Sequence, residues 1–278
     1  MSETARTQPK HSASRIWLPA IVFVAAIAAW EAYVRMAGVP AYILPAPSLI
    51  VTTLVADWPV LSVALLVTLK TTLAGLALAV IGGVALALLL SLSRVVEYSI
   101  YPFAVALQVT PVVAISPLLL IYMPQEIAVL ACAWIVAFFP ILSNTMLGLQ
   151  SADRNLLDLF ALYSGNPMTL RQRLASRLKA LWLLRFPAAL PSFLTGMKIA
   201  GGLSLIGAVV AEMAAGSAGV SSGLAYRIIE SQYRLNIPRL FAALVLLALT
   251  GIVIFLVTSA LSRLALRHWH ESAMEPEA

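Results

Sequence analysis

The chain has 278 residues, of which 61% are hydrophobic and only 11% are charged, and its mean hydropathy is +0.94. A soluble domain cannot bury so much apolar surface, so this composition predicts a protein whose solvent is the lipid membrane. The net charge of +6 indicates a positive-inside bias in the loops, and no basic patch interleaved with aromatic residues points to nucleic acid. The single cysteine, Cys132, excludes a disulfide within the chain.

Continuous apolar runs predict membrane-spanning α-helices, because a span needs about 20 mainly apolar residues. The runs lack the period-two alternation of a membrane β-barrel. Six qualify, at about 16–37, 62–92, 98–122, 126–149, 188–212 and 239–265. The first follows three basic residues, and Ala26-Ile27-Ala28 within it resembles the cleavage site of a signal peptide. Because the apolar run continues to Ala37, we expect a retained helix.

The charges between the runs predict the orientation of the chain. The segment 150–186 carries six basic and two acidic residues, and basic residues also precede the first run and end the sixth. By the positive-inside rule, these segments lie in the cytoplasm. We therefore expect a cytoplasmic tail at 1–15, a transmembrane domain at 16–267 and a cytoplasmic tail at 268–278. The Gly- and Ser-rich stretch 214–228 is expected to form a tight turn or a short re-entrant element at the outer mouth.

The segment 150–186 is too long for a mere connection. The apolar rhythm of 156–163, with Asp153 as its N-cap, predicts one helix, and 173–186 predicts a second that is basic on one side and apolar on the other. Gly165-Asn166-Pro167 separates the two. The resulting hairpin is either a helix pair lying on the lipid surface or a docking element for a soluble partner.

Two patterns in the fifth run bear on how its helix starts and packs. Pro187 and Pro191 stand at its head, and because proline is favoured in the first turn of a helix, we expect them to start the span sharply and to join it rigidly to the hairpin. Small residues recur every four positions in the second and fifth runs and predict close helix contacts, either as static packing or as a moving interface. They are Gly75, Ala79, Gly83 and Ala87, and Gly196, Ala200, Ser204 and Ala208.

The third run contains prolines in its interior, at Pro111 and Pro117. Mid-helix prolines leave carbonyl groups without partners, which polar side chains or water must satisfy. Gln108, Thr110 and Ser116 lie nearby. A broken helix of this kind often lines a transport pathway, and a kinked packing helix is the alternative. We predict that these five residues line a translocation path.

No motif of catalysis or metal binding stands out. The sequence lacks a phosphate-binding loop, HExxH, CxxC and a nucleophile–base pair. His268 and His270 are two residues apart and point to different helix faces, which disfavours a metal site. We therefore expect no catalytic residue, no metal and no cofactor. Glu212 lies near the outer interface, and the scarcity of charge at mid-membrane disfavours a proton relay.

In four segments the chain resembles the permease subunits of bacterial ABC importers, specifically the nitrate, sulfonate and taurine type. The segments are YILPAPSLI (42–50), TPVVAISPLLLIYM (110–123), FFPILSNTMLGL (138–149) and FPAALPSFLTGMKIAGGLSLIGAVVAEM (186–213). Their order and spacing cover nearly the whole chain. The resemblance implies an all-α membrane protein with six transmembrane helices and the type I importer permease architecture, whose hairpin couples to an ATPase.

The family's cytoplasmic signature, EAA-x-x-x-G followed after nine residues by I-x-L-P, matches here in two halves. Leu184-x-Phe186-Pro187 fits its end, and Asp158-Leu159-Phe160 stands where EAA would, with Ser164 at the glycine position, one before Gly165. The halves lie about ten residues too far apart, and 164–173 is interpreted as an insertion of about three helical turns. The residues that the resemblance assigns to ATPase coupling are Asp158, Leu159, Phe160, Ser164, Gly165, Leu174, Ala175, Trp182, Leu183 and Pro187.

The resemblance also implies how such a subunit works. It pairs with a second permease copy, as a homodimer, in the bacterial cytoplasmic membrane, and a separate ATP-binding cassette subunit hydrolyses ATP. An extracytoplasmic binding protein delivers a small solute. That solute is either an organic anion, or a sulfonate- or nitrate-like anion, or else a vitamin or the precursor of one. The alternatives are a self-sufficient secondary transporter, which would need buried ionisable residues, and a membrane enzyme, which would need a cluster of reactive side chains.

Overall fold

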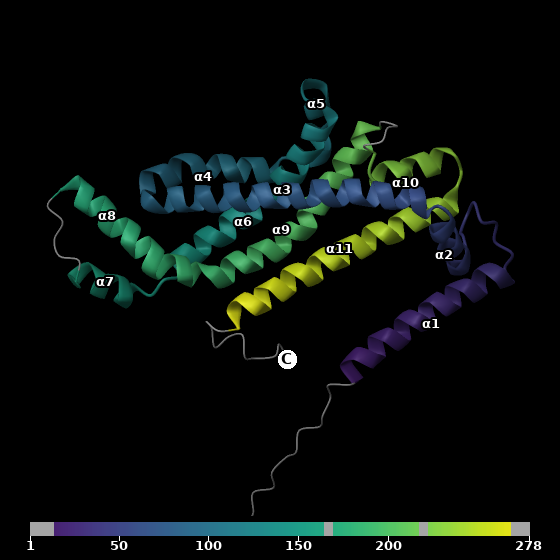
Figure 1. Ribbon diagram of the computed structural model, residues 1–278, viewed down its shortest axis with the longest axis horizontal. Helices are drawn as coiled ribbons and strands as arrows, with labels where there is room; N and C mark the ends of the chain where they lie inside the picture. The colour runs from purple at the N-terminus through teal and green to yellow at the C-terminus, as the bar shows by residue number, and fades with distance from the viewer. Residues whose placement is uncertain (1–13, 164–168, 217–221, 268–278) are drawn as a thin grey trace, which may run out of the picture.

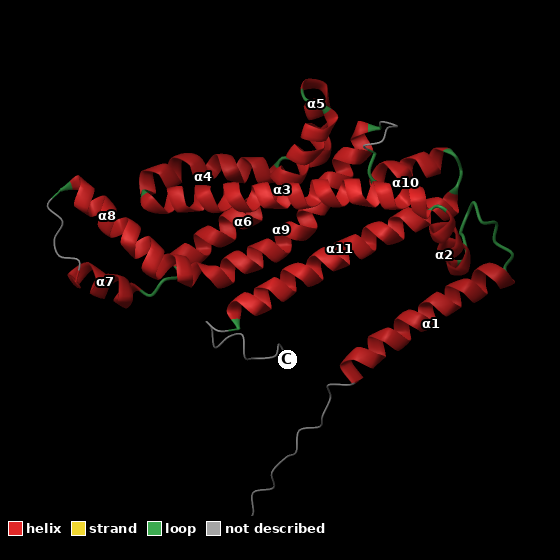
Figure 2. Cartoon of the chain, in the orientation of Figure 1, coloured by secondary structure: helices red, strands yellow, loops and turns green. Residues whose placement is uncertain are grey.

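The computed structural model describes residues 14–163, 169–216 and 222–267, and all the regular elements among them are helices (Figure 2). In chain order they are α1 (Ser14–Met36), α2 (Pro47–Ala56), α3 (Trp58–Leu92), α4 (Arg94–Val109), α5 (Val112–Tyr122), α6 (Gln125–Gln150), α7 (Arg154–Tyr163), α8 (Leu170–Ala180), a π-helical turn (Leu181–Arg185), α9 (Phe186–Ala215), α10 (Leu224–Tyr233) and α11 (Ile237–Leu266). The helices α7 and α8 project at one end of the long bundle, and α2 and α10 lie at the other (Figure 1).

The six predicted apolar runs coincide with helices. Among the described residues, five helices are long and apolar enough to cross a membrane, namely α1, α3, α6, the helix that contains α9, and α11. A sixth candidate is the pair α4 and α5, which is bent by 98°. The prediction of an all-α membrane protein is therefore confirmed. The second span is longer than expected, because α3 begins at Trp58, directly after the short helix α2.

The helix α6 lies at the centre of the molecule, between α3 and α9. Gly75 and Gly83 of α3 are so close to α6 that an added Cβ would stand 2.6 Å from the Ala133 Cβ and 2.7 Å from a methyl carbon of Ile141, respectively. On the other side, an added Cβ at Gly207 of α9 would stand 2.6 Å from the Cys132 carbonyl oxygen. All eight small residues of the two predicted stripes are buried. The stripes therefore serve as packing faces against α6.

Pro187 lies in the first turn of α9, as expected, and Pro191 lies inside that helix. The chain is helical without interruption from Leu170 to Ala215, and only the turn at Leu181–Arg185 departs from α-geometry. Pro187 has no N–H to give to the Leu183 carbonyl, and its ring crowds that carbonyl. A π-helical turn, in which the Phe186 N–H donates to the Leu181 carbonyl, accommodates it. The span therefore has no sharp start, because the chain is already helical before Pro187, and the expected joint to the hairpin is a continuous helix.

Two short helices lie where the sequence indicated loops. The helix α2 has Pro47 in its first turn, and the Glu31 carboxylate of α1 accepts a hydrogen bond from the Ser48 N–H at 3.0 Å, which caps it from a distant part of the chain. The helix α10 begins at Leu224, within the stretch 214–228 that was expected to form a tight turn or a short re-entrant element; residues 217–221 of that stretch lie outside the described residues. Neither helix is long enough to give a strong periodic signal.

The first span stands apart from the rest of the bundle (Figure 1). Its last turns make its contacts: the Trp30 ring lies 5.9 Å from the Phe241 ring of α11, and Arg35 joins Glu31 in binding the Ser48 hydroxyl. Most of its apolar side chains are exposed. The exposed apolar surface of α1 is therefore free to contact lipid, as expected of a membrane span.

Candidate functional site

A sharp break in the third predicted span forms the centre of the candidate site. The helix α4 ends at Val109, and α5 leaves it at 98° after Thr110 and Pro111, so that α5 projects from the bundle (Figure 1). Thr110 closes α4, because both its N–H, at 3.2 Å, and its hydroxyl, at 2.7 Å, donate to the Ala106 carbonyl. The break that the two interior prolines predicted is therefore present, and it falls at Pro111.

A cavity of about 270 Å³ lies at this break. Residues of the α4–α5 junction, the middle of α6 and one residue of α9 line it: Leu107, Gln108, Val109, Thr110, Pro111, Val112, Ile135, Val136, Pro140 and Leu203. Three of the five residues predicted to line a translocation path, Gln108, Thr110 and Pro111, thus meet at one cavity. The other two lie farther along α5: the buried Ser116 donates to the Val113 carbonyl at 3.2 Å, and Pro117 is exposed outside this lining.

Two prolines, Pro111 and Pro140, line this cavity. Pro111 and Pro140 have no N–H, so the carbonyls four residues earlier, at Leu107 and Val136, lose their usual helical partner. Both of those residues line the cavity. Pro140 and Val136 were not among the predicted path residues, although a proline in the middle of the fourth run was a signal for them. The Pro140 carbonyl itself accepts from the Asn144 amide at 2.9 Å.

The helices α7 and α8 form the predicted hairpin. Asp153 caps α7 as predicted, since its carboxylate accepts from the Asn155 N–H at 2.8 Å. The helix α8 begins at Leu170, earlier than expected, because Thr169 and Gln172 form a reciprocal capping box. The end of the supposed insertion 164–173 therefore belongs to a helix.

The apolar side chains of the hairpin are largely uncovered. Leu159 and Trp182 are 51% and 58% exposed, and Leu183 is 64% exposed, whereas Phe160 is half-buried. Asp158 and Ala175 are exposed and Pro187 is half-buried. Ser164 and Gly165 lie outside the described residues, as does the side chain of Leu174. Exposed apolar groups at a membrane face suit either lipid contact or docking of a protein partner.

The hairpin is fixed to the ends of the membrane helices. The Arg177 guanidinium donates to the carbonyl of Leu92, the last residue of α3, at 3.3 Å, where a cation also complements the negative end of the helix dipole. The Ser151 hydroxyl reaches the Ala188 carbonyl of α9 at 3.5 Å. A displacement of the hairpin therefore acts directly on α3 and α9.

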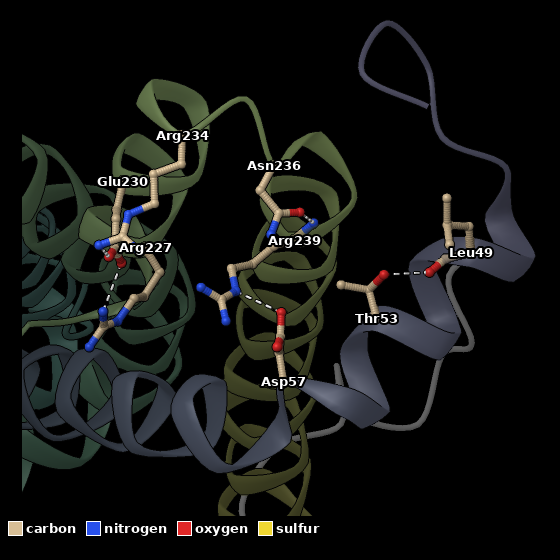
Figure 3. Close-up of polar contacts among 8 residues, drawn as sticks. All are labelled: Leu49, Thr53, Asp57, Arg227, Glu230, Arg234, Asn236 and Arg239. Carbon is tan, nitrogen blue, oxygen red and sulfur yellow. Dashed lines mark hydrogen bonds and ion pairs between the residues drawn. The ribbon is translucent and has the colours of Figure 1, made fainter. Parts of the chain in front are cut away.

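The opposite end of the bundle carries ion pairs that the sequence analysis did not identify (Figure 3). Arg239, in the first turn of α11, pairs with Asp57 before α3 at 2.6 Å. Within α10, Glu230 pairs with Arg227 at 2.7 Å and with Arg234 at 3.0 Å. The hydrogen bond from Arg227 and the positive charges around it lower the pKa of Glu230 below its ordinary value. The Arg239–Asp57 pair joins residues 182 positions apart, which spacing alone could not reveal, whereas the two pairs of Glu230 are local and have the i,i+3 and i,i+4 spacings of a helix.

Deeper at this end, the carboxylate of Glu212 is buried, with only 5% of the residue exposed. It accepts from the Thr68 hydroxyl of α3 and from the Ala225 N–H of α10. The sequence analysis placed Glu212 near the outer interface and gave it no role. Among the described residues, no group of three His, Cys, Asp or Glu side chains is placed to hold a metal ion.

Comparison with known proteins identifies the family. Residues 75–267 match the model of the binding-protein-dependent transport system inner membrane component. The chain belongs to this family. This permease is 32% identical over 250 residues to the formylaminopyrimidine transport permease protein ThiX of Halalkalibacterium halodurans, covering 89% of this chain and 94% of the relative.

Two further relatives carry other transport names. The riboflavin transport system permease protein RibX of Chloroflexus aurantiacus is 31% identical over 250 residues, covering 87% of this permease and 86% of the relative. The putative aliphatic sulfonates transport permease protein SsuC of Bacillus subtilis is 27% identical over 239 residues, covering 84% and 79%. The predicted resemblance to ABC importer permeases is thus confirmed, and the chain is a transport permease of this family rather than an enzyme.

Proposed function

We propose that this permease forms the path by which an ATP-driven importer passes a vitamin, or the precursor of one, across the cytoplasmic membrane. The observation that carries the choice of solute is the wall of the cavity at the α4–α5 break. It offers the amide of Gln108, the hydroxyl of Thr110 and backbone carbonyls among apolar side chains, and none of its lining residues is charged. Such a surface suits an uncharged heteroaromatic solute better than a strongly hydrated anion.

The relatives give this choice independent support. Two of them are named for formylaminopyrimidine and for riboflavin transport, and both cover more of this chain than the sulfonate permease does. A sulfonate or nitrate remains the alternative solute, and a screen of ligands separates the two classes. In either case an extracytoplasmic binding protein would deliver the solute to the end of the bundle that carries α2 and α10.

The proposed energy source is a separate ATP-binding cassette subunit docked on the hairpin. Leu159, Trp182 and Leu183 are exposed apolar anchors of the kind that fill a groove on a protein partner. The uninterrupted helix from Leu170 to Ala215 would transmit the movement of that partner to the membrane helices. We further propose that two copies of the permease enclose the path.

The proposed orientation places the hairpin and both termini in the cytoplasm. Arg94, the basic residues of α8, and Arg263 and Arg267 gather at the hairpin ends of the described helices, which supports this side as the cytoplasmic one. On this assignment residues 1–15 and 268–278 are cytoplasmic tails of the domain 16–267. Fusion of alkaline phosphatase at the C-terminus should give an inactive enzyme, and a fluorescent protein at the same place should be bright.

The deciding experiment is purification of the tagged permease from native membranes, followed by mass spectrometry of the proteins that accompany it. We expect an ATPase with a phosphate-binding loop. The complex is then reconstituted into vesicles and tested for ATP-dependent uptake of riboflavin, a formylaminopyrimidine, an aliphatic sulfonate and nitrate. Uptake without ATP by the permease alone would contradict the proposal and indicate a secondary transporter. Uptake of the anions alone would overturn the choice of solute.

A further inference from the structure

Three helices meet at the buried carboxylate of Glu212, which lies one turn before the end of α9. The hydroxyl of Thr68, on α3, donates to its two oxygens at 2.9 and 3.0 Å. The N–H of Ala225, on α10, donates to one of the same oxygens at 3.1 Å. Thr68 and Glu212 are both nearly inaccessible to solvent, so these hydrogen bonds form in an environment where a lost partner is costly.

The same cluster starts α10. The first N–H groups of a helix have no partner within it, and the N-cap residue Gly223 has no side chain to provide one. Instead, the Thr68 hydroxyl accepts from the Leu224 N–H at 2.9 Å, and Glu212 accepts from the next N–H. A Cβ at Gly223 would overlap the Glu212 carboxylate, so a larger residue there would have to push that carboxylate out of its place. Side chains of α3 and α9 therefore cap the first two N–H groups of α10.

We propose that Glu212 is a positioning residue that binds α10 to the outer ends of α3 and α9, so that the three helices move as one unit. The inference rests on the proposed import function, in which an outer element must follow the helix that runs to the hairpin. The chain is helical from Leu170 to Ala215, so Glu212 sits on the same uninterrupted helix as the coupling elements. We call the hydrogen-bonded group of Glu212, Thr68 and the first N–H groups of α10 the clamp. The clamp thereby connects the face that receives solute with the face that meets the ATPase.

The hydrogen-bond directions make the role of Glu212 specific. Thr68 accepts from Leu224 and must therefore donate its own proton, and the Ala225 N–H is also a donor. Glu212 must accept from both, which a carboxylate does with either oxygen. Glutamine could still accept from both donors, because both reach the same oxygen, Oε2. Methionine has a similar length and no acceptor oxygen, so Glu212→Met should weaken the clamp with little change in packed volume.

The test measures the distance between α10 and α3 in the complete complex in lipid nanodiscs. Spin labels are attached at Tyr233→Cys and Val63→Cys, which are exposed positions on the two helices, whereas the native Cys132 is fully buried and unreactive. Double electron–electron resonance is recorded without nucleotide and after trapping with ATP and vanadate. Labelled permease is diluted with unlabelled permease, so that a complex carries one labelled copy. The unmodified clamp should then give one narrow distance that is the same in both states, and Glu212→Ala, Glu212→Met and Thr68→Val should widen the distribution about twofold.

Two matched variants serve as controls. Thr68→Ser keeps the hydroxyl and should keep the narrow distribution. Glu230→Gln removes a carboxylate that pairs with Arg227 in α10 and with Arg234 directly after it, and should also keep the narrow distribution. A narrow distribution in Thr68→Val or Glu212→Met, or a distance in the unmodified clamp that changes on trapping, would overturn the inference. A complex that hydrolyses no ATP would instead count against the proposed function, while the distances would still decide the clamp.

Discussion

Close contact between α6 and α9 depends on residues without a side chain. At Gly207 the backbones of the two helices touch, and an added Cβ would stand 2.6 Å from the Cys132 carbonyl oxygen and 2.9 Å from the Ala133 Cα. Backbone atoms cannot turn aside as the end of a side chain can, so the helices themselves would have to separate. Gly202, on the same helix, faces open space within 4 Å.

We expect Gly207→Ala to lower the free energy of unfolding by about 1–3 kcal/mol, because the helices must move apart. Gly202→Ala should leave it unchanged or raise it by up to about 1 kcal/mol, since alanine favours a helix and meets nothing there. Thermal unfolding of the purified protein in detergent compares the two. Equal midpoints for the two variants would contradict the packing described for α6.

Glu230 gives the outer end of the molecule a dependence on pH. Its ion pairs with Arg227 and Arg234 lower its pKa below the ordinary value of 4.5. A carboxyl with a lowered pKa in the folded state stabilises that state above its unfolded pKa, and the contribution is lost as the pH falls through the folded value.

The unfolding midpoint should therefore decrease as the pH falls below about 4.5, and Glu230→Gln should decrease less over the same range. Differential scanning fluorimetry between about pH 6 and pH 3 measures both slopes. Parallel slopes would show that other carboxyls dominate. At neutral pH the variant should be slightly less stable than the native protein, because it lacks the charge-assisted bonds.

At the scale of the element, the break between α4 and α5 places the polar side chains of Gln108 and Thr110 at a cavity. Regular helices satisfy their own backbone and offer lipid only side chains. The residues of the break and the α6 residues around Pro140 line one cavity. Irregular backbone at membrane depth is tolerated where it lines a cavity, so the break and the cavity belong together.

We expect cysteines at Gln108 and Thr110 to react with a membrane-impermeant thiol reagent, because both positions line the cavity at the break. The matched control is Ser116→Cys, one turn into α5, where the residue is 1% exposed and its cysteine should react at least about tenfold more slowly. The native Cys132 should not react. Equal, slow labelling at all three introduced cysteines would show that the cavity is closed to water.

The hairpin is a second element whose role is open to a direct test. Leu159→Asp places a charge on an exposed apolar position and should reduce solute-coupled ATP hydrolysis of the complex by about tenfold, while insertion into the membrane is unchanged. Leu159→Met keeps an apolar side chain and should retain coupling. The ratio of ATPase activity with and without solute-loaded binding protein is the measurement. Normal coupling in Leu159→Asp would assign this face to lipid.

At the scale of the whole molecule, local patterns predicted the spans and the hairpin well. Apolar length located the six runs, Pro111 located the break, and the spacing of Gly75 and Gly83 identified the packing face of α3. Local patterns failed where the structure depends on contacts between distant parts of the chain. The Thr68–Glu212 hydrogen bond joins positions 144 residues apart, which no local pattern indicates. Pro187 predicts the start of a span when only the sequence is known, because the continuous helix before it is not visible there.

The burial of α6 between two glycine-lined surfaces limits how the permease can change shape. Because α3 and α9 each interlock with α6 through close backbone contacts, pulling any of the three away from the others would open voids along their whole length. Separating α3, α6 and α9 from one another would therefore cost more free energy than rotating the three helices together as a rigid body. We expect such a rigid body to move against its neighbours at the lightly attached α1 and at surfaces that meet another chain.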